Sequence, residues 1–295
     1  MIGTMKYRTL GKTGVSVSVV GIETHQWSGR GGMYLSEEEV TAILSHAQDV
    51  GVNFIDTGEC YLYHSAERLV GSALRSNRDK FVIATKFGHR MSEGIVVPGW
   101  NVSEIEKELE ISLKALRTDY IDIYQIHINA PSDKRYFLDQ LNAIETLLTK
   151  TLVSGKIRSV GVCLGDNILL DPKATLLSKA IEHLPIAVVQ TVYNRLDCTA
   201  EEKVIPLAQK ANLGIVARVP LAKGYLSSRF KPAKNFDEHR LAQVKEIQKS
   251  EVPAGIDLAE WSISWCIKNT AVATVVPGCT SPEQLDSSVK AILLI

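Results

Sequence analysis

Short β-rich runs alternate with longer segments of helical period along almost the whole chain, and no other feature of the sequence limits the fold as strongly. The runs with strand character are Val19–Ile22, Asn53–Asp56, Phe81–Lys86, Ile121–Ile126, Ser159–Cys163, Ala187–Thr191, Gly214–Val219 and Thr274–Val276. The segments with helical period are residues 37–50, 65–76, 102–116, 134–152, 168–182, 200–211, 256–269 and 282–293. This alternation is typical of parallel βα units, and eight of them predict an α/β fold of the (β/α)8 TIM barrel type.

The chain length and two irregular segments complete the predicted architecture. A length of 295 residues fits one large barrel domain spanning residues 1–295. Near the N-terminus, Tyr7–Leu10 and Val15–Val17 flank the turn sequence Gly11–Gly14, which predicts a β-hairpin that caps the floor of the barrel. Residues 230–250 fit neither a strand nor a core-facing helix and indicate an insertion after the seventh strand. Ser281-Pro282-Glu283 supplies an N-cap, an N1 proline and a first-turn acid for the last helix.

Composition excludes several classes of protein. Lys and Arg together number 33, as do Asp and Glu, so the net charge indicates neither a nucleic-acid partner nor an anionic membrane surface. No stretch approaches the roughly 18 apolar residues of a membrane span. The five cysteines are scattered and form no CxxC pair, which argues against a disulfide framework or a metal site. We therefore expect a cytoplasmic protein in a reducing compartment.

Four titratable residues stand at or just beyond consecutive strand ends. Asp56 ends the second run, Lys86 ends the third, His127 follows the fourth, and Tyr61 lies five residues after Asp56. The carboxyl ends of barrel strands meet at one rim, so these side chains are expected to converge. A tyrosine has a reference pKa of about 10, which a nearby lysine cation lowers, while a carboxylate holds that lysine in place. The set predicts a proton relay, with the histidine orienting a substrate oxygen or sharing in proton transfer.

Each of these four residues has an ordinary structural reading when it is taken singly. An aspartate or lysine at a strand end is more often a salt-bridge partner than a catalyst. A lone histidine is more often a hydrogen-bonded structural residue. Their shared position at the functional rim favours the catalytic interpretation.

Spaced motifs across nearly the whole chain resemble the aldo-keto reductase superfamily. The motifs are Gly51–Thr57 with Tyr61 and Glu67, Ala84–Lys86, Asp119–Asp122 with Gln125–His127, Gly155–Arg158, Pro220–Ala222 with Gly224, and Pro277–Gly278 with Glu283–Leu285. The resemblance implies a (β/α)8 barrel that reduces aldehydes or ketones to alcohols by hydride transfer from a nicotinamide cofactor. It implies that Tyr61 is the general acid, that Lys86 and Asp56 tune Tyr61, and that His127 orients the carbonyl.

The same resemblance implies a set of cofactor contacts. They are Thr24, Asp56, Cys163, Gln190, Arg218, Leu221, Gly224, Arg229, Gly278, Thr280, Ser281, Gln284 and Ser288. Thr24 and Gln190 match positions that face the nicotinamide half. Arg218 stands where many members have an aromatic ring, and its planar guanidinium is able to stack on the nicotinamide instead. Leu221–Gly224 and Arg229 match the loop at the pyrophosphate, although Arg229 is equally a solvated loop charge.

Three departures from the family pattern bear on the cofactor. Cys163-Leu164 replaces a frequent Ser-Asn pair that holds the carboxamide. Thr280 and Ser281 occupy places where Lys or Arg is common near the 2′-phosphate, and Ser288 replaces a frequent Asn, which leaves Gln284 and the hydroxyls at a helix N-terminus. We expect NADPH as the cofactor, with NADH as the alternative, and no metal.

Substrate and biological role are less constrained. Trp27, Tyr63, His64, His89 and Asn129 lie on or near predicted rim loops, and each is a candidate for the substrate pocket or for plain surface. The sequence ends just after the last helix, where many relatives continue, which predicts an open pocket for a small carbonyl substrate. The alternatives are a cofactor-binding regulatory subunit with little turnover and an NAD-dependent sugar dehydrogenase. The sequence does not indicate an oligomeric state.

Overall fold

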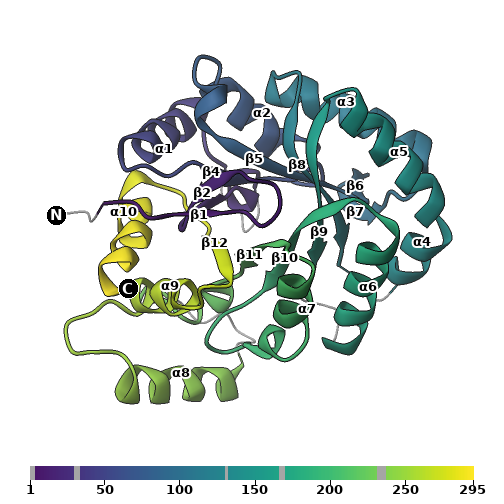
Figure 1. Ribbon diagram of the computed structural model, residues 1–295. Coiled ribbons are helices and arrows are strands. Elements are labelled where there is room, and N and C mark those ends of the chain that lie inside the picture. Colours follow the sequence, from purple (N-terminus) through teal and green to yellow (C-terminus); the bar gives the residue numbers. More distant parts are fainter. Residues whose placement is uncertain (1–3, 30–33, 130–131, 166–169, 231–236) are drawn as a thin grey trace.

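Eight parallel strands follow one another around a barrel in the computed structural model, which describes residues 4–29, 34–129, 132–165, 170–230 and 237–295 (Figure 1). The barrel strands are β3 (Ile22–Glu23), β4 (Phe54–Asp56), β5 (Val82–Phe87), β8 (Ile121–Ile128), β9 (Ile157–Leu164), β10 (Ile186–Val192), β11 (Gly214–Arg218) and β12 (Val272–Val276). Parallel bridges from Val20 to Val275 and from Glu23 to Gly278 join the first strand to the last. The structure confirms the predicted (β/α)8 barrel.

Helices form a ring around the strands (Figure 1). They are α1 (Glu37–Asp49), α2 (Ser65–Ala73), α3 (Val102–Leu116), α4 (Asp133–Asp139), α5 (Leu141–Val153), α6 (Leu170–His183), α7 (Val204–Lys210), α8 (Glu238–Ser250), α9 (Leu258–Lys268) and α10 (Pro282–Lys290). Local chemistry sets several of their ends. Ser36 and Glu39 form a capping box at α1, and Ser281 caps α10 with Pro282 in its first turn, as the sequence predicts.

Two predicted helices are divided in the structure. The segment predicted as one helix over residues 134–152 breaks at Gln140, whose φ of −103° and ψ of 3° end α4 and begin α5. The segment predicted over residues 200–211 is a 3-10 turn, Thr199–Glu201, followed by α7. Lys203 interrupts the helical geometry with φ −138° and ψ −46°. Hydrophobic periodicity continues across such breaks, so it does not reveal them.

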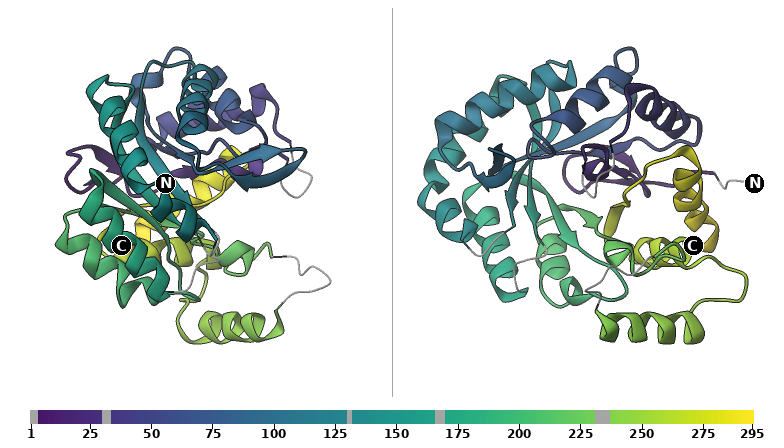
Figure 2. Two further views of the ribbon diagram at one scale, coloured as in Figure 1. Left: turned by 90° about the vertical axis from the view of Figure 1, so that its right-hand side faces the viewer. Right: turned by 180° about the vertical axis from the view of Figure 1, so that it is seen from behind.

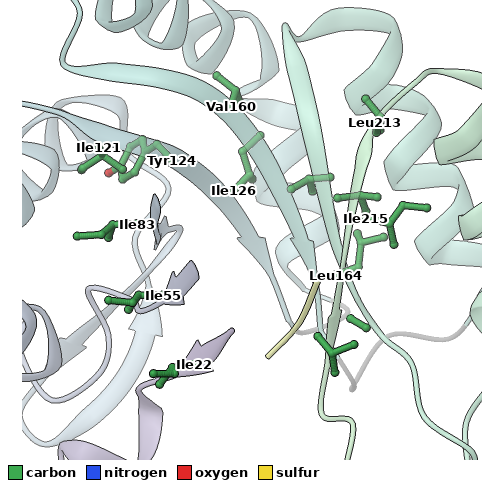
Figure 3. Packing of buried hydrophobic residues seen from close by; sticks show 14 of the residues in the cluster. Ile22, Ile55, Ile83, Ile121, Tyr124, Ile126, Val160, Leu164, Leu213 and Ile215 are labelled. Carbon is green, nitrogen blue, oxygen red and sulfur yellow. The ribbon is translucent and has the colours of Figure 1, made fainter. Parts of the chain in front are cut away.

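The pleat of the strands separates the core into an outer and an inner layer. Ile22, Ile55 and Ile83 on neighbouring strands belong to the large cluster that packs against the helices (Figure 3). Phe54 and Val82, one residue earlier on β4 and β5, belong to a second cluster inside the barrel. Successive strand residues point to opposite faces, so every second residue of a barrel strand faces the lumen.

The predicted N-terminal hairpin is present and closes one end of the barrel. Its strands, β1 (Tyr7–Thr9) and β2 (Ser16–Ser18), pair antiparallel. Leu10 in its turn is buried in the inner cluster with Phe54 and Val82. The Arg8 guanidinium donates to the backbone oxygens of Ile267, Asn269 and Val272, which ties the hairpin to the region between α9 and β12.

A second hairpin lies at the other end of the barrel and was not predicted. Its strands are β6 (His89–Ser92) and β7 (Ile95–Pro98), joined through Glu93 and Gly94, both with positive φ. Figure 2 (left) shows this hairpin and the β1–β2 hairpin on opposite sides of the molecule. Glu-Gly is a turn sequence, but only four residues flank it on each side, so the pattern is short.

Residues 230–250 follow the seventh barrel strand, β11, as an insertion before α9, as the sequence predicts, but part of them forms a helix that the pattern did not indicate. Residues 231–236 lie outside the described part of the chain, but Glu238–Ser250 form a regular helix, α8, which follows β11. The Asp237 side chain caps it by accepting from the Arg240 backbone amide. Only Val244 and Ile247 are buried, against Leu226 and Trp261 among others. The apolar stripe is too narrow to produce a strong helical period, so the sequence pattern missed the helix.

Two further sequence predictions concern the chain as a whole. The five cysteines all lie in the described part of the chain, and no two of them are joined by a disulfide. Within the described ranges, we find no helix with the length and apolar content needed to cross a membrane.

Truncating Leu10, the hairpin residue that plugs the floor of the barrel, is expected to destabilise the protein. Leu10 is 1% exposed and fills the space above Gly214, where an added Cβ would lie 2.5 Å from Leu10 Cγ. Leu10→Ala should lower the free energy of unfolding by about 2–5 kcal/mol because it leaves a cavity. Urea denaturation measures the change. Val153→Ala is the matched control, since Val153 is 85% exposed and its truncation should change stability by less than about 0.5 kcal/mol. Equal effects of the two substitutions would contradict the assignment of Leu10 as the plug.

Candidate active site

Polar side chains gather in the lumen where the barrel strands end. Ile55 faces the helices, so the pleat turns Asp56 inward. The same alternation turns Lys86 inward after the outward Thr85, and it turns His127 inward after the outward Ile126. The sequence-predicted set therefore converges at the carboxyl ends of β4, β5 and β8, the rim where barrel enzymes carry their active sites.

Lys86 is the centre of the hydrogen-bond network. Its Nζ atom donates to Asp56 Oδ2 at 2.7 Å, to the Thr57 backbone oxygen at 2.6 Å and to the Tyr61 hydroxyl at 3.1 Å. Lys86 and Asp56 are each 1% exposed. The other Asp56 oxygen accepts from Gln125 Nε2 at 3.2 Å. A buried ammonium with three acceptors is fully hydrogen-bonded, and this fixes the position of the tyrosine hydroxyl.

The effect of the site on Tyr61 differs from the sequence prediction. A lysine neighbour was expected to lower the pKa of Tyr61, but that pKa is raised well above its usual value. Burial is the main cause, and the negative groups Glu23 and Asp56 add to it. The Lys86 charge is already compensated by Asp56 at 2.7 Å. The Tyr61 hydroxyl is therefore protonated and able to donate a hydrogen bond.

His127 is a neutral histidine in a dry environment. Both of its ring nitrogens are buried and have no hydrogen-bond partner among the described residues. Burial lowers its pKa well below the ordinary value, and the neighbouring His89, Arg218 and Lys86 act in the same direction. A neutral imidazole carries one N–H donor and one acceptor, so His127 is suited to hold a substrate oxygen.

The predicted substrate-facing residues separate into two groups. His89 lies at the rim, with its ring 4.9 Å from that of His127 and its Nε2 3.0 Å from Asp133. Asn129 is half-buried just after β8, and its buried side-chain oxygen has no hydrogen-bond partner in the part of the chain that the structure describes. In contrast, the buried Trp27 donates its Nε1 hydrogen to the Cys279 backbone oxygen at 2.6 Å. Tyr63 is 43% exposed, and its hydroxyl accepts a hydrogen bond from the Gly94 amide. Of these residues, His89 contacts a member of the predicted catalytic set, because its ring packs against that of His127.

His64 belongs to a supporting network behind the tyrosine. Its imidazole bonds to Glu67 and, at 2.7 Å, to Glu108 on α3, while Thr85 donates to the other oxygen of Glu67 at 2.6 Å. Leu62, Tyr63 and His64 all have positive φ, between 51° and 61°. The network therefore holds a strained loop directly after Tyr61.

Glu23 is a functional candidate that the sequence interpretation missed. It is the Cα partner of Asp56 across β3 and β4, and its neighbour Ile22 faces the helices, so Glu23 faces the lumen. Burial and the nearby Asp56 raise its pKa to about 7. The predicted first strand stopped at Ile22, one residue short. The rule that located Asp56 and Lys86, a charged residue at a strand end, also applies to Glu23.

Four predicted nicotinamide contacts also lie around the lumen. Thr24 Oγ1 and Gln190 Nε2 are buried, and neither has a hydrogen-bond partner within the described ranges of the chain. Cys163 Sγ donates to Gln190 Oε1 at 2.9 Å, and Arg218 ends β11. Buried polar atoms of this kind are rare in folded proteins, so they are available to a polar ligand such as an amide.

The predicted phosphate-binding segments have their own internal bonds. In the loop after β11, the Gly224 amide donates to the Leu221 oxygen at 2.8 Å, while Arg229 is exposed. At α10, the Thr280 amide donates to Gln284 Oε1 at 3.1 Å, and Ser281 Oγ caps the helix. Ser288 Oγ donates to the Gln284 backbone oxygen. Gly278 lies between these segments and the site, as the bridge partner of Glu23.

The chain matches the family model described as "Aldo/keto reductase family" over residues 20–294. The chain belongs to the aldo/keto reductase family. Among curated members, it is 28% identical to the uncharacterized oxidoreductase YqkF of Bacillus subtilis, over 97% of this chain and 91% of that protein. It is 26% identical to the aldo-keto reductase YhdN of the same organism, over 96% of this chain and 87% of that protein.

Solved structures of the family support the same assignment. The holo form of aldo-keto reductase AKR11C1 from Bacillus halodurans superimposes with a TM-score of 0.83 at 27% identity, covering 98% of this chain and 91% of that one. Its apo form gives a TM-score of 0.75 at 26% identity, covering 98% and 90%. Family membership and these relatives identify the chain as an oxidoreductase of the aldo/keto reductase type, which acts on small carbonyl compounds.

The His64 bridge is expected to stabilise the protein in a pH-dependent manner. Although burial opposes the charged form, hydrogen bonds with Glu67 and Glu108 raise the pKa of His64 above its usual value. Its contribution is fully present below the unfolded pKa of about 6.5 and is lost as the pH rises through the higher folded pKa. His64→Gln should therefore lower stability by about 1–3 kcal/mol at pH 6 and by less at pH 9.

Thermal unfolding of both proteins between pH 6 and pH 9 measures this difference. Backbone strain at residue 64 is the same at every pH, so a pH-independent loss would show that strain, and not the charged bridge, is the cause. His183→Gln is the control, because the His183 side chain is 39% exposed and its one charged contact among the described residues is Glu182 at 3.5 Å.

Proposed function

We propose that this protein is an NADPH-dependent reductase that converts a small aldehyde or ketone to the alcohol, with Tyr61 as the general acid. The observation that carries the proposal is the buried Lys86 ammonium, which holds the Tyr61 hydroxyl at 3.1 Å and Asp56 at 2.7 Å beside the neutral His127. The bound cofactor would supply a hydride to the carbonyl carbon. The residues of the chain must then hold the carbonyl oxygen and give it a proton.

Tyr61 and His127 are suited to share that oxygen. The Tyr61 hydroxyl donates one hydrogen bond and the neutral His127 another, and both bonds strengthen as the oxygen becomes negative. The raised pKa of Tyr61 keeps it protonated in the resting site. Once the oxygen has become an alkoxide, it is a stronger base than the Tyr61 phenolate and takes the proton. Lys86 stabilises the phenolate that remains.

Unpartnered polar atoms favour the expected position for the nicotinamide. Thr24 Oγ1 and Gln190 Nε2 are buried and open to a ligand's hydrogen bonds. Arg218, at the end of β11, offers a planar cation for stacking.

The preference for NADPH is an expectation from the family, and two local features at the start of α10 support it. Ser281 Oγ and the amides of the first turn of α10 form a neutral helix N-terminus that favours an anion. The side-chain oxygen of Gln284 already accepts from the Thr280 amide. Its side-chain NH2 group is therefore the part that would donate to a phosphate. These neutral donors support a modest preference for NADPH over NADH. A single domain and a cytoplasmic location stay predictions.

Replacing the acid should separate chemistry from cofactor binding. Tyr61→Phe removes the donor but leaves the ring, so carbonyl reduction should fall by about 10²–10⁴-fold. The dissociation constant for NADPH should change less than twofold, because the hydroxyl is bonded to Lys86 and not assigned to the cofactor. Stopped-flow absorbance at 340 nm with 4-nitrobenzaldehyde measures the first effect, and fluorescence titration measures the second.

Two outcomes favour the alternatives. Full activity of Tyr61→Phe would overturn the assignment of Tyr61 as the acid. Tight cofactor binding by the wild-type protein without turnover of simple aldehydes would favour a regulatory subunit, and rapid oxidation of sugars with NAD⁺ would favour the dehydrogenase. Tyr63→Phe is the matched control, since its exposed hydroxyl bonds to the Gly94 amide and should not affect reduction.

A positive charge added before α10 should increase the preference for NADPH over NADH. Thr280 is half-buried two residues before Pro282 and contributes its backbone amide to Gln284. Thr280→Arg should tighten NADPH relative to NADH by roughly tenfold, since a charge-assisted hydrogen bond contributes about 1.5 kcal/mol or more. Paired fluorescence titrations give the ratio. Thr280→Gln adds length without charge as the control, and an unchanged ratio in Thr280→Arg would place the 2′-phosphate elsewhere.

A further inference from the structure

Glu23 gives the lumen a second carboxylate that the proton relay does not use. Asp56 is hydrogen-bonded to Lys86 and Gln125, whereas Glu23 accepts only a backbone hydrogen bond, from His25 at 3.2 Å, among the bonds of the described residues. Its side chain is 19% exposed, so it lies at the mouth of the barrel and not in the sealed core. A carboxylate that is largely removed from water, with the His25 ring at 3.9 Å as the one ion pair shown for it among the described residues, is stabilised by a further positive group.

The charged groups around Glu23 come from β4, β5, β11 and the turn that follows β3. Asp56 on β4 repels it, while Lys86 on β5 and Arg218 on β11 attract it. His25, the next titratable group along the chain, approaches to 3.9 Å and stacks on the Tyr61 ring with a centroid distance of 4.4 Å. Lys86 is already paired with Asp56. A ligand that carries a positive charge near Glu23 would therefore add to these attractions.

The position of Glu23 relative to the chemistry follows from Tyr61. Among the charged groups that act on the Tyr61 hydroxyl, Glu23 has the largest effect, ahead of Asp56. A carbonyl held by Tyr61 must lie about 3–3.5 Å from the atom that delivers the hydride. Thr24, the next residue in the chain, is one of the expected contacts of the nicotinamide half. Glu23 therefore faces the region in which the nicotinamide ring changes from neutral to cationic.

We propose that the Glu23 carboxylate is the counter-charge for the oxidised nicotinamide ring, and that it makes this site discriminate between the oxidised and reduced forms of its cofactor. The inference rests on the proposed function and deepens it. In the reduction, the hydride and its electron pair leave the neutral ring for the carbonyl carbon, and Tyr61 supplies the proton to oxygen. Glu23 gains and loses no atom. It stabilises the positive charge that the ring acquires, in surroundings where water screens the interaction weakly.

The free protein adds a pH signature to this role. The raised pKa of Glu23, about 7, means that a mixture of the acid and the carboxylate is present near neutrality. A cationic ligand favours the carboxylate, and by reciprocity its binding lowers the pKa of Glu23. Binding of the oxidised cofactor should then release a proton near pH 7, and its affinity should rise with pH and level off once Glu23 is ionised. The reduced cofactor has a neutral ring and should show neither effect.

Binding measurements on the intact protein test the inference without using turnover. Isothermal titration calorimetry with NADP⁺ and NADPH, between pH 6 and pH 8.5 and in two buffers of different ionisation enthalpy, gives both affinities and the protons released. Glu23→Gln should weaken NADP⁺ by about tenfold at pH 8, within the usual range of coupling between sites, while NADPH changes less than twofold. The variant should also lose the proton release at pH 7.

Three matched variants sharpen the result. Glu23→Asp keeps the charge and should retain most of the preference for NADP⁺. Glu246→Gln removes an exposed carboxylate on α8 and should have no effect. His25→Gln removes the other titratable neighbour and should leave the proton release in place. If that release persists in Glu23→Gln and vanishes in His25→Gln, the proposal is wrong and His25 carries the effect.

The outcomes separate this inference from the proposed function. If neither NADP⁺ nor NADPH binds the wild-type protein, both are wrong. If both bind and Tyr61→Phe loses reduction, but Glu23→Gln keeps the wild-type ratio of the two affinities, the reductase stands and the role of Glu23 is overturned. Loss of affinity for both forms equally in Glu23→Gln would also overturn it, because a counter-charge acts on one form only.

Discussion

The alternation of side chains along eight parallel strands is the constraint on which the rest of the structure depends. Both faces of each strand are buried, by helices outside and by the lumen inside, so a register shift of one residue would exchange Ile55 with Asp56. The apolar residues on the outer face thereby fix the direction of the polar ones. The same pleat that packs the core aims Asp56, Lys86 and His127 at a common space.

Charge balance in that space decides what the polar residues can do. Lys86 and Asp56 are buried as an ion pair, and hydrogen bonds to Thr57, Tyr61 and Gln125 offset the cost of removing both charges from water. Because the pair is internally compensated, it positions Tyr61 without acidifying it. The result is a site of neutral donors, ready to respond to negative charge on a ligand oxygen.

The loop that carries Tyr61 shows how local strain is supported by tertiary contacts. Three successive residues with positive φ cost of order 1–3 kcal/mol each in ordinary chains. Glu67 anchors this loop from α2 by accepting hydrogen bonds from Thr85 on β5 and Ser112 on α3, while His64 spans Glu67 and Glu108. The barrel strand, two helices and the loop are thus joined behind the tyrosine, and its hydroxyl stays beside Lys86.

The sequence by itself determined the barrel, its floor hairpin, the start of the last helix and the four residues at or just beyond strand ends that converge in the lumen, because strand alternation and strand ends are local patterns. It missed the hairpin at His89–Pro98, the helix at Glu238–Ser250 and the division of residues 134–152, where the apolar signal is short, narrow or continuous across a break. Only the tertiary structure decided the electrostatics. The pKa of Tyr61 is raised and not lowered, and Glu23 joins the site, because burial and the approach of charges from separate strands depend on closure of the barrel.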